Sequence, residues 1–356
     1  MDTETIAMTK RVDIDNETFL KAMHTYETPE KFYDQARIML TNEEMIMIAE
    51  MGPEAVSHSA LVKIIKDNNL AEDPEELITY SWRKSVLNKE KKEGSDEMHY
   101  KITSFYGLVS SYCRWESEVY RTFPKDVIDQ INDYVFEVAL GQHRKTILNR
   151  MNGIGFEDRY LQSDFLTLQE ALQAIDEAKG PFHLVPCDCK SLVYYHHKNN
   201  NVCLNIGARS HSLNGAATKG LGEEISREEA KELVKRCNSQ GLMQVGEHDG
   251  FCNCDGVCCF PIRRGKYLGA RGIYPQAHWK IDFHEDECNH CGICAKLCNF
   301  GAFQYDAYKH VTFNPDKCYG CTICSSNCPK DAIHLIRTGA RPVPGFLLEE
   351  EEDDGC

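Results

Sequence analysis

The chain has 356 residues, which is enough for about two or three domains with apolar cores of their own. Its formal net charge of −15 disfavours nucleic acid and anionic membrane surfaces as partners, because both are themselves negatively charged. Its eighteen cysteines come without an apolar signal segment or an apolar run of about 18 residues, so we expect no membrane span and a cytoplasmic, reducing, anaerobic setting in which thiols bind metal.

Residues 1–105 are predicted to form a helical domain. Short amphipathic runs at 43–50 and 59–68 each indicate a helix. A third helix is expected to begin at Asp73-Pro74, since aspartate caps a helix and proline suits its first turn. We expect that helix to run towards Leu87.

A charged turn at 89–96 and a strand-like segment at 99–103 follow the three helices. Three helices and a hairpin predict a winged-helix-like fold for this domain. Because residues 1–100 contain 12 Lys or Arg against 21 Asp or Glu, the domain is poorly suited to neutralising the phosphates of a duplex. We therefore expect a protein-docking or structural role and no DNA binding.

Residues 106–266 are predicted to form a cysteine-rich α/β domain. It opens on an aromatic stretch, which we expect in the core or at a domain interface rather than around a flavin. The capping box Thr167-x-x-Glu170 predicts a helix to about Lys179, and a strand at 183–185 leads to the cysteines. The aromatic residues are Phe105, Tyr106, Tyr112, Trp115, Tyr120 and Phe123.

The cysteines of this domain are spaced for metal binding. Cys187-x-Cys189 and Cys252-x-Cys254 each place two thiols on one face of an extended segment, because side chains i and i+2 point the same way. A helix from the capping box Ser226–Glu229 to about Gly241 is expected to bring the second group back to the first. We expect four thiolates to hold an iron–sulfur cluster or a structural zinc, with unliganded reduced thiols as the remaining alternative.

The candidate ligands of this middle centre are Cys187, Cys189, Cys203, Cys252, Cys254, Cys258 and Cys259. Three other cysteines, namely Cys113, Cys237 and Cys356, are expected to be bystanders.

One cysteine pattern then occurs twice. The first copy is Cys288-x2-Cys291-x2-Cys294-x3-Cys298, and the second, 30 residues later, is Cys318-x2-Cys321-x2-Cys324-x3-Cys328-Pro329. Each copy predicts a short strand, a cysteine loop, one or two helical turns and a returning strand. Soft thiolates at this spacing predict [4Fe–4S] clusters. The alternatives are disulfides or zinc, although zinc sites usually pair two Cys-x2-Cys knuckles across a longer loop.

This repeat resembles the bacterial two-cluster ferredoxin domain over residues 278–338. In that family the fourth cysteine of each run binds the other cluster. The resemblance therefore implies a ferredoxin-like domain at 267–340 with two [4Fe–4S] clusters. It implies one cluster on Cys288, Cys291, Cys294 and Cys328, and another on Cys318, Cys321, Cys324 and Cys298. Asn299 departs from the family, which usually has a proline where the second copy has Pro329.

Most of the chain resembles a family of anaerobe proteins described as 4Fe–4S dicluster-containing iron–sulfur proteins. The resemblance is carried by PCDCK at 186–190, by the helix that begins at Ser226, and by CNCDGVCC at 252–259. It implies electron transfer and an α+β chain with a winged-helix-like N-terminal domain, a cysteine-rich middle, a ferredoxin-like domain and an acidic tail at 341–356. Asp255-Gly256 interrupts a run that is denser in cysteine in related sequences.

We expect an electron-transfer protein or subunit that relays single electrons through two clusters, or three with the middle centre, to a partner oxidoreductase that contains a flavin, a metal or a corrinoid. One alternative is an oxidoreductase in its own right, whose middle centre keeps an open coordination site near Asp255, Cys258 and Cys259. Another is a redox-sensing winged-helix regulator, which the acidic N-terminal domain disfavours. No catalytic residue is predicted.

Overall fold

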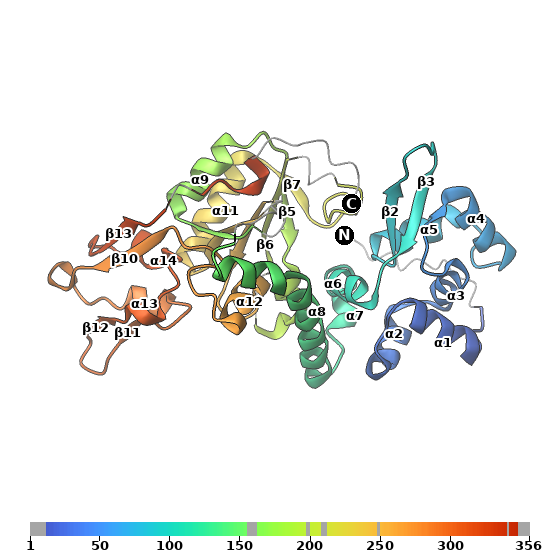
Figure 1. Cartoon of the computed structure of the whole chain (residues 1–356), viewed down its shortest axis with the longest axis horizontal. Coiled ribbons are helices and arrows are strands. Elements are labelled where there is room, and N and C mark those ends of the chain that lie inside the picture. Colours follow the sequence, from blue (N-terminus) through green and yellow to red (C-terminus); the bar gives the residue numbers. More distant parts are fainter. Residues whose placement is uncertain are drawn as a thin grey trace. The chain divides into compact units, whose positions relative to one another are not determined.

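A computed structural model describes residues 12–154, 162–196, 200–207, 212–247, 250–339 and 342–347. The chain forms two compact units (Figure 1). Among the described residues, unit 1 contains 12–127 and 212–221, and unit 2 contains the others. Both units mix helices and sheets, as the sequence predicts. The acidic run at 349–354 lies outside the described residues.

Unit 1 combines short helices with one small antiparallel sheet in the order β1-β3-β2. Its strands are β1 (Val56–Ser57), β2 (Leu87–Lys91) and β3 (Met98–Ile102). Its helices are α1 (Asn16–Thr25), α2 (Tyr33–Met39), α3 (Asn42–Met51), α4 (His58–Asp67), α5 (Pro74–Arg83), α6 (Phe105–Trp115) and α7 (Ser117–Tyr120).

The third predicted helix, α5, begins where expected, but its predicted end is wrong. The Asp73 side chain accepts a hydrogen bond from the Glu75 N–H at the start of α5. The helix ends at Arg83, because Ser85 adopts a left-handed φ of 64° and cannot continue it. Leu87 therefore begins β2, and the charged residues Lys89 and Lys91 lie in that strand rather than in a turn.

The aromatic stretch after β3 contributes to the core of unit 1, as predicted. Phe105, Tyr112, Tyr120 and Phe123 are all buried. Their burial removes apolar surface from water, which is the main favourable term in folding. Tyr106 and Trp115 of the same stretch are half-buried.

A buried lysine also belongs to unit 1. Lys219 is 3% exposed, and its Nζ donates to Ser85 Oγ at 2.6 Å. Burial lowers the pKa of Lys219 to about 8, and the nearby charges of Arg114 and Lys89 act in the same direction. The folded unit therefore carries the cost of a buried charge at neutral pH.

Replacing Lys219 with methionine is expected to stabilise unit 1 at pH 7 by roughly 2 kcal/mol, after allowing for the lost hydrogen bond. The folded chain loses this proton near pH 8, whereas the unfolded chain keeps it to about pH 10.4. Between these values the unfolded state binds more protons, so wild-type stability rises with pH and the advantage of the variant shrinks. Unfolding free energies of both proteins at pH 7 and pH 10 check this, and a pH-independent difference would contradict it.

Unit 2 is built on a six-stranded antiparallel sheet in the order β4-β8-β9-β6-β5-β7. Its strands are β4 (Asp164–Leu166), β5 (Phe182–Pro186), β6 (Asn201–Ile206), β7 (Glu223–Ile225), β8 (Met243–Gly246) and β9 (Gly250–Cys254). Its longer helices are α8 (Lys125–Met151), which begins in unit 1, α9 (Leu168–Glu177), α11 (Arg227–Ser239) and α12 (Phe260–Leu268).

Two helices cover one face of this sheet (Figure 1). Both begin with the capping boxes that the sequence predicts, at Thr167 for α9 and at Ser226 for α11. Their apolar sides pack against Leu204, Ile206 and Phe251 of the sheet. The opposite face carries Met243, Val245 and the cysteines of β9.

The repeated cysteine runs lie between two further strand pairs. These strands are β10 (Trp279–Phe283), β11 (Phe303–Tyr305), β12 (Val311–Phe313) and β13 (Ile333–Arg337). The short helices α13 (Ile293–Leu297) and α14 (Ile323–Ser326) follow the first two cysteines of each run and contain the third. Strand, loop, helical turn and returning strand thus appear twice, as the repeat predicts.

The longest helix, α8, has 27 residues but carries charged residues along its length. Within the described ranges, no helix has both the length and the apolar character that crossing a bilayer requires.

Candidate metal centres

Strand pairing brings the two cysteine runs together. β10, which precedes the first run, pairs with β13, which follows the second, and Phe283 lies opposite Ile333. β11 and β12 pair with each other between the runs. Because the strand pairs interlock in this way, the last cysteine of each run is delivered to the first three of the other.

Two cavities result, and each is lined by four cysteines. The first is lined by Cys288, Cys291, Cys294 and Cys328. The second is lined by Cys298, Cys318, Cys321 and Cys324. These are the two quartets that the ferredoxin resemblance implies. Apart from the thiols the walls are mainly apolar, with Phe283, Val311 and Ile333 at the first cavity and Ile281, Phe300 and Phe303 at the second.

Backbone amides point at several of these sulfurs. The N–H groups of His290, Ala302 and Gly320 donate to the Sγ atoms of Cys288, Cys298 and Cys318 at 3.3, 3.2 and 3.4 Å. Gly320 has a φ of 73°, and a Cβ there would lie 2.7 Å from the Cβ of Ala277, so this turn requires glycine. Such donors stabilise negative charge on sulfur ligands.

Burial disfavours thiolates in these cavities unless a cation is bound. It raises the pKa of Cys294 to about 11 and that of Cys321 to about 12. Soft metal ions reverse this, because they bind the deprotonated sulfur directly. All-sulfur quartets, apolar walls and amide donors together suit an iron–sulfur cluster in each cavity.

Comparison with known proteins identifies this region. Residues 281–335 match the family model described as a 4Fe-4S dicluster domain. This segment is therefore a 4Fe-4S dicluster domain. The match includes both cysteine runs and supports iron–sulfur binding. No curated protein sequence matches the chain.

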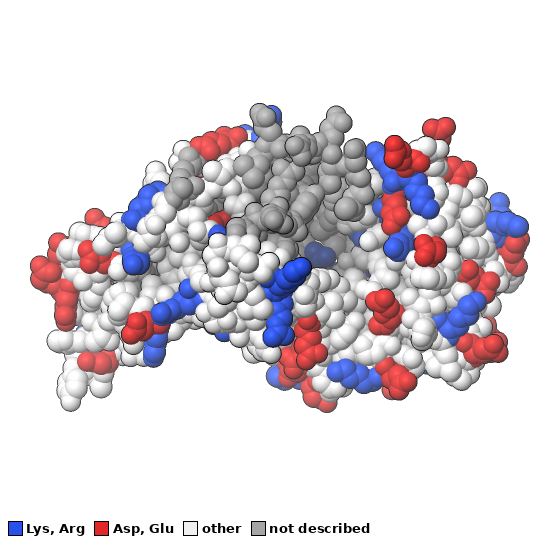
Figure 2. Space-filling view, in the orientation of Figure 1, with Lys and Arg blue, Asp and Glu red and all other residues white. Residues whose placement is uncertain are grey.

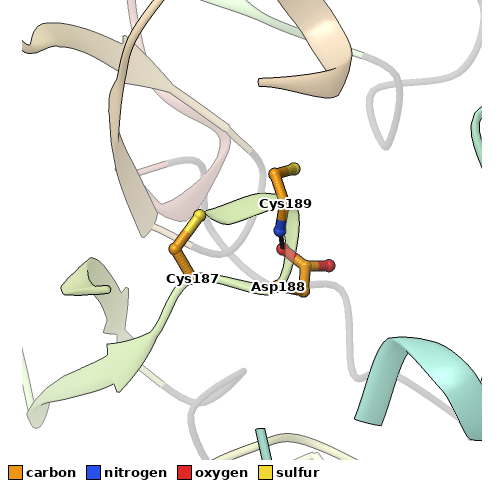
Figure 3. Close-up of side chains that lie close together, drawn as sticks. All are labelled: Cys187, Asp188 and Cys189. Atoms are coloured by element: carbon orange, nitrogen blue, oxygen red, sulfur yellow. Dashed lines mark hydrogen bonds between the residues drawn. The ribbon is translucent and has the colours of Figure 1, made fainter. Parts of the chain in front are cut away.

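The remaining metal-binding candidates lie on the sheet of unit 2, outside the dicluster domain. Cys187 follows β5, Cys203 lies in β6, and Cys252 and Cys254 lie in β9. The register that pairs Leu204 with Phe251 also places Cys203 beside Cys252. The prediction that this Cys-x-Cys pair is extended is wrong at Cys189, which lies in the short helix α10 (Asp188–Leu192) directly after Cys187. The first turn of α10 still brings the thiols of Cys187 and Cys189 close to each other (Figure 3).

Six of the seven candidate thiols form a continuous series of contacts. The Cys187 thiol lies within 4.8 Å of the Cys189 thiol and also interacts with the Cys203 thiol. Further thiol contacts join Cys203 to Cys252 and Cys252 to Cys254. The Cys259 thiol completes the series, 2.8 Å from Cys254 Sγ. We call these six residues, Cys187, Cys189, Cys203, Cys252, Cys254 and Cys259, the middle thiol group.

The seventh candidate, Cys258, is turned towards a buried ion pair. Its thiol donates to Asp255 Oδ2 at 3.2 Å, and the same oxygen lies 2.5 Å from Lys190 Nζ. Burial opposes the charge on Asp255, but Lys190 and the N–H groups of Cys258 and Val257 outweigh it and hold the pKa of Asp255 well below its usual range. Cys258 therefore lies beside the middle thiol group with a polar partner of its own.

Sequence reasoning missed two features of these sites. The first is the role of Lys190, whose position directly after Cys189 was the available signal. The second is a group at the surface of the dicluster domain, where Glu285, His290 and His310 lie within 4.8 Å of one another. Their separation in the sequence gave no signal for this proximity.

The bystander cysteines are not brought to either site where they are described. Cys113 lies in α6 of unit 1, and Cys237 is buried in the core between α11 and the sheet. Cys356 lies outside the described residues.

Proposed function

We propose that this protein is an electron carrier, or an electron-transfer subunit, that relays single electrons through two [4Fe–4S] clusters to a partner oxidoreductase. The observation that carries this proposal is the presence of two cavities in the dicluster domain, each with four cysteine side chains. We assign one cluster to Cys288, Cys291, Cys294 and Cys328, and the other to Cys298, Cys318, Cys321 and Cys324. When bound, each cluster supplies a reversible one-electron couple.

Packing supports a relay between the two cavities. Cys294 and Cys328 of the first quartet share one apolar core with Cys298 and Cys324 of the second. Phe303 is buried in that core and helps to exclude water from the space between the quartets. A short, dry separation favours rapid transfer and limits loss of electrons to solvent.

The surface of the dicluster domain supports a basic redox partner. Residues 281–335 contain seven acidic and four basic residues. Glu285, Asp286 and Glu287 are exposed directly before Cys288, and Cys291 is itself exposed. Figure 2 shows acidic side chains on the end of unit 2 that carries β10–β13. We propose that electrons enter or leave here, through a partner whose flavin, metal or corrinoid centre lies beneath a basic patch.

The setting and the role of unit 1 are part of the same proposal. We propose a cytoplasmic, anaerobic location, because low-potential clusters and free thiols persist where oxygen is excluded.

We also propose that residues 1–105 form a winged-helix-like module for protein docking. Three helices, α3 to α5, and the β2–β3 hairpin support that fold, and the acidic balance of this region supports a protein partner.

The test is a metal and sulfide analysis of the full chain purified without oxygen. Cys291→Ala and Cys321→Ala are each expected to remove about four iron and four sulfide atoms per chain relative to wild type. The dithionite-reduced wild type is expected to show an electron paramagnetic resonance (EPR) spectrum with features of interacting [4Fe–4S] clusters and to reduce a one-electron dye. Protein without acid-labile sulfide after reconstitution would overturn the proposal.

A further inference from the structure

The middle thiol group has no role in the dicluster domain, yet its six members come from three distant segments and meet in one place, where three of them are buried and three are half-buried. We propose that this group binds a third iron–sulfur cluster through four of its six thiols. The site is separate from both quartets of the dicluster domain, and its ligand class is an all-thiolate iron cluster.

The group is compact rather than linear. Besides the contacts in series, Cys189 acts electrostatically on Cys259, and Cys187 acts on Cys254. The two ends of the series, Cys189 and Cys259, therefore lie within range of each other's charge. Four sulfurs converging from several directions are what a cubane cluster requires, whereas an ordinary apolar core would spread its cysteines among other side chains.

The start of α12 provides hydrogen-bond donors for this site. α12 begins at Phe260, directly after Cys259. The Phe260 N–H favours the thiolate form of Cys189, and the Ile262 N–H favours the thiolate form of Cys259. The positive end of a helix and its free N–H groups stabilise negative charge, which thiolates and their cluster would carry.

The polar neighbour of the site is the Lys190–Asp255 pair. Lys190 is 2% exposed and follows Cys189 directly, so its ammonium group lies buried beside the thiols. Asp255 holds it in place and accepts from the Cys258 thiol at 3.2 Å. A buried cation next to an anionic cluster lowers the cost of the negative charge. Cys258 is thus a positioning residue in this assignment rather than a ligand.

Packing places the middle thiol group against the second cavity of the dicluster domain. Cys254 and Cys259 belong to the same apolar core as Ile323 of α14, and Cys321 packs against that core. Phe300 and Tyr319 stack with ring centroids 4.1 Å apart and pack against it as well. Zinc has no redox chemistry, so a redox-active centre accounts for this placement better than a structural zinc does.

The sequence departs at two places from the families that it resembles, and these two places contact each other. They lie where the middle thiol group approaches the second cavity of the dicluster domain. Asn299 occupies the usual proline position, and its side chain accepts from the Gly256 N–H at 2.9 Å and donates to the Gly241 carbonyl at 2.8 Å. Gly256 belongs to the Asp255-Gly256 interruption, and a Cβ there would lie 2.7 Å from the Asn299 carbonyl oxygen. Proline could not make these hydrogen bonds, so the two departures form one contact between the sites.

The redox role of this centre rests on the proposed function, because its electrons come from the dicluster domain. With clusters bound, Cys298, Cys318, Cys321 and Cys324 would hold the donor of one electron and the middle thiol group would hold its acceptor. The donor would be oxidised by one electron and the acceptor reduced by one. No bond forms or breaks, and the ultimate reductant is the external low-potential donor.

Metal analysis of the anaerobically purified full chain tests the site. Wild type is expected to contain about twelve iron and twelve sulfide atoms, and the triple variant Cys187→Ala/Cys203→Ala/Cys254→Ala about eight of each, because three remaining thiols cannot supply four ligands. Cys237→Ala is a matched control that should keep all twelve. About eight irons with zinc in wild type would overturn the iron–sulfur assignment, and eight without zinc would overturn the metal site.

Reduced-state EPR provides a second measurement, which does not depend on iron yield. The triple variant should lose the features due to spin coupling between the middle centre and its neighbour while keeping the signals of the dicluster domain. An unchanged spectrum would overturn the inference. A chain that contains only about four irons, all lost in the triple variant, would instead refute the proposed dicluster relay and leave the middle site standing.

Discussion

Replacing Cys298 with alanine is expected to abolish the cluster of the second cysteine run, although Cys298 belongs to the first run in sequence. It lines the cavity of Cys318, Cys321 and Cys324, because interlocked strand pairing carries it across. Losing one of four thiolates removes the anchor of a whole cluster, so about four iron and four sulfide atoms should be lost. The EPR spectrum of the reduced variant should match that of Cys321→Ala and differ from that of Cys291→Ala.

The reciprocal variant makes this result decisive. Cys328→Ala should match Cys291→Ala, since both side chains line the first cavity. Cys113→Ala is the matched control, because that cysteine is buried in the core of unit 1 and lines neither cavity, so the variant should retain full iron content. If Cys298→Ala instead reproduced the spectrum of Cys291→Ala, each run would bind its own cluster and the crossed assignment would be wrong.

Local signals in the sequence predict much of this fold. Capping boxes at Thr167 and Ser226 depend only on residues three apart, and both helices begin where those residues place them. The repeat likewise predicts the strands around the two cysteine runs, because the signals of each copy lie within a short stretch of sequence. The end of α5 shows the limit, because a serine in a left-handed conformation at position 85 is not recognisable from its residue type.

Features that depend on long-range pairing are not visible in the sequence. Lys190 and Asp255 are 65 residues apart, and only the order of strands in the sheet brings them together. Similarly, residues 212–221 interrupt the sequence of unit 2 but pack in unit 1, where the Trp82 indole N–H donates to the Leu213 carbonyl. The spacing of the middle cysteines indicates a metal site, whereas its contact with the dicluster domain follows from packing alone.

Replacing Lys84 with methionine is expected to destabilise unit 1 by about 3–5 kcal/mol, because it leaves a buried carboxylate without its cation. Lys84 Nζ lies 2.5 Å from Glu44 Oε2, and the two side chains are 3% and 0% exposed. Glu44 also accepts hydrogen bonds from Ser81 Oγ and from the Thr41 N–H. It therefore cannot turn towards water without losing the capping box at the start of α3. Denaturant unfolding followed by tryptophan fluorescence measures this, in a Trp279→Phe background that leaves Trp82 and Trp115 of unit 1 as reporters.

An exposed pair in the same unit offers a matched control for this experiment. Lys21 and Glu50 lie 3.5 Å apart but are 57% and 45% exposed, so Lys21→Met should cost less than about 1 kcal/mol. The double variant Glu44→Gln/Lys84→Met should recover part of the loss, since a neutral amide keeps an acceptor for the cap without a buried charge. If Lys84→Met and Lys21→Met lowered the free energy of unfolding equally, burial would not make the Glu44–Lys84 pair more important for stability than an exposed pair.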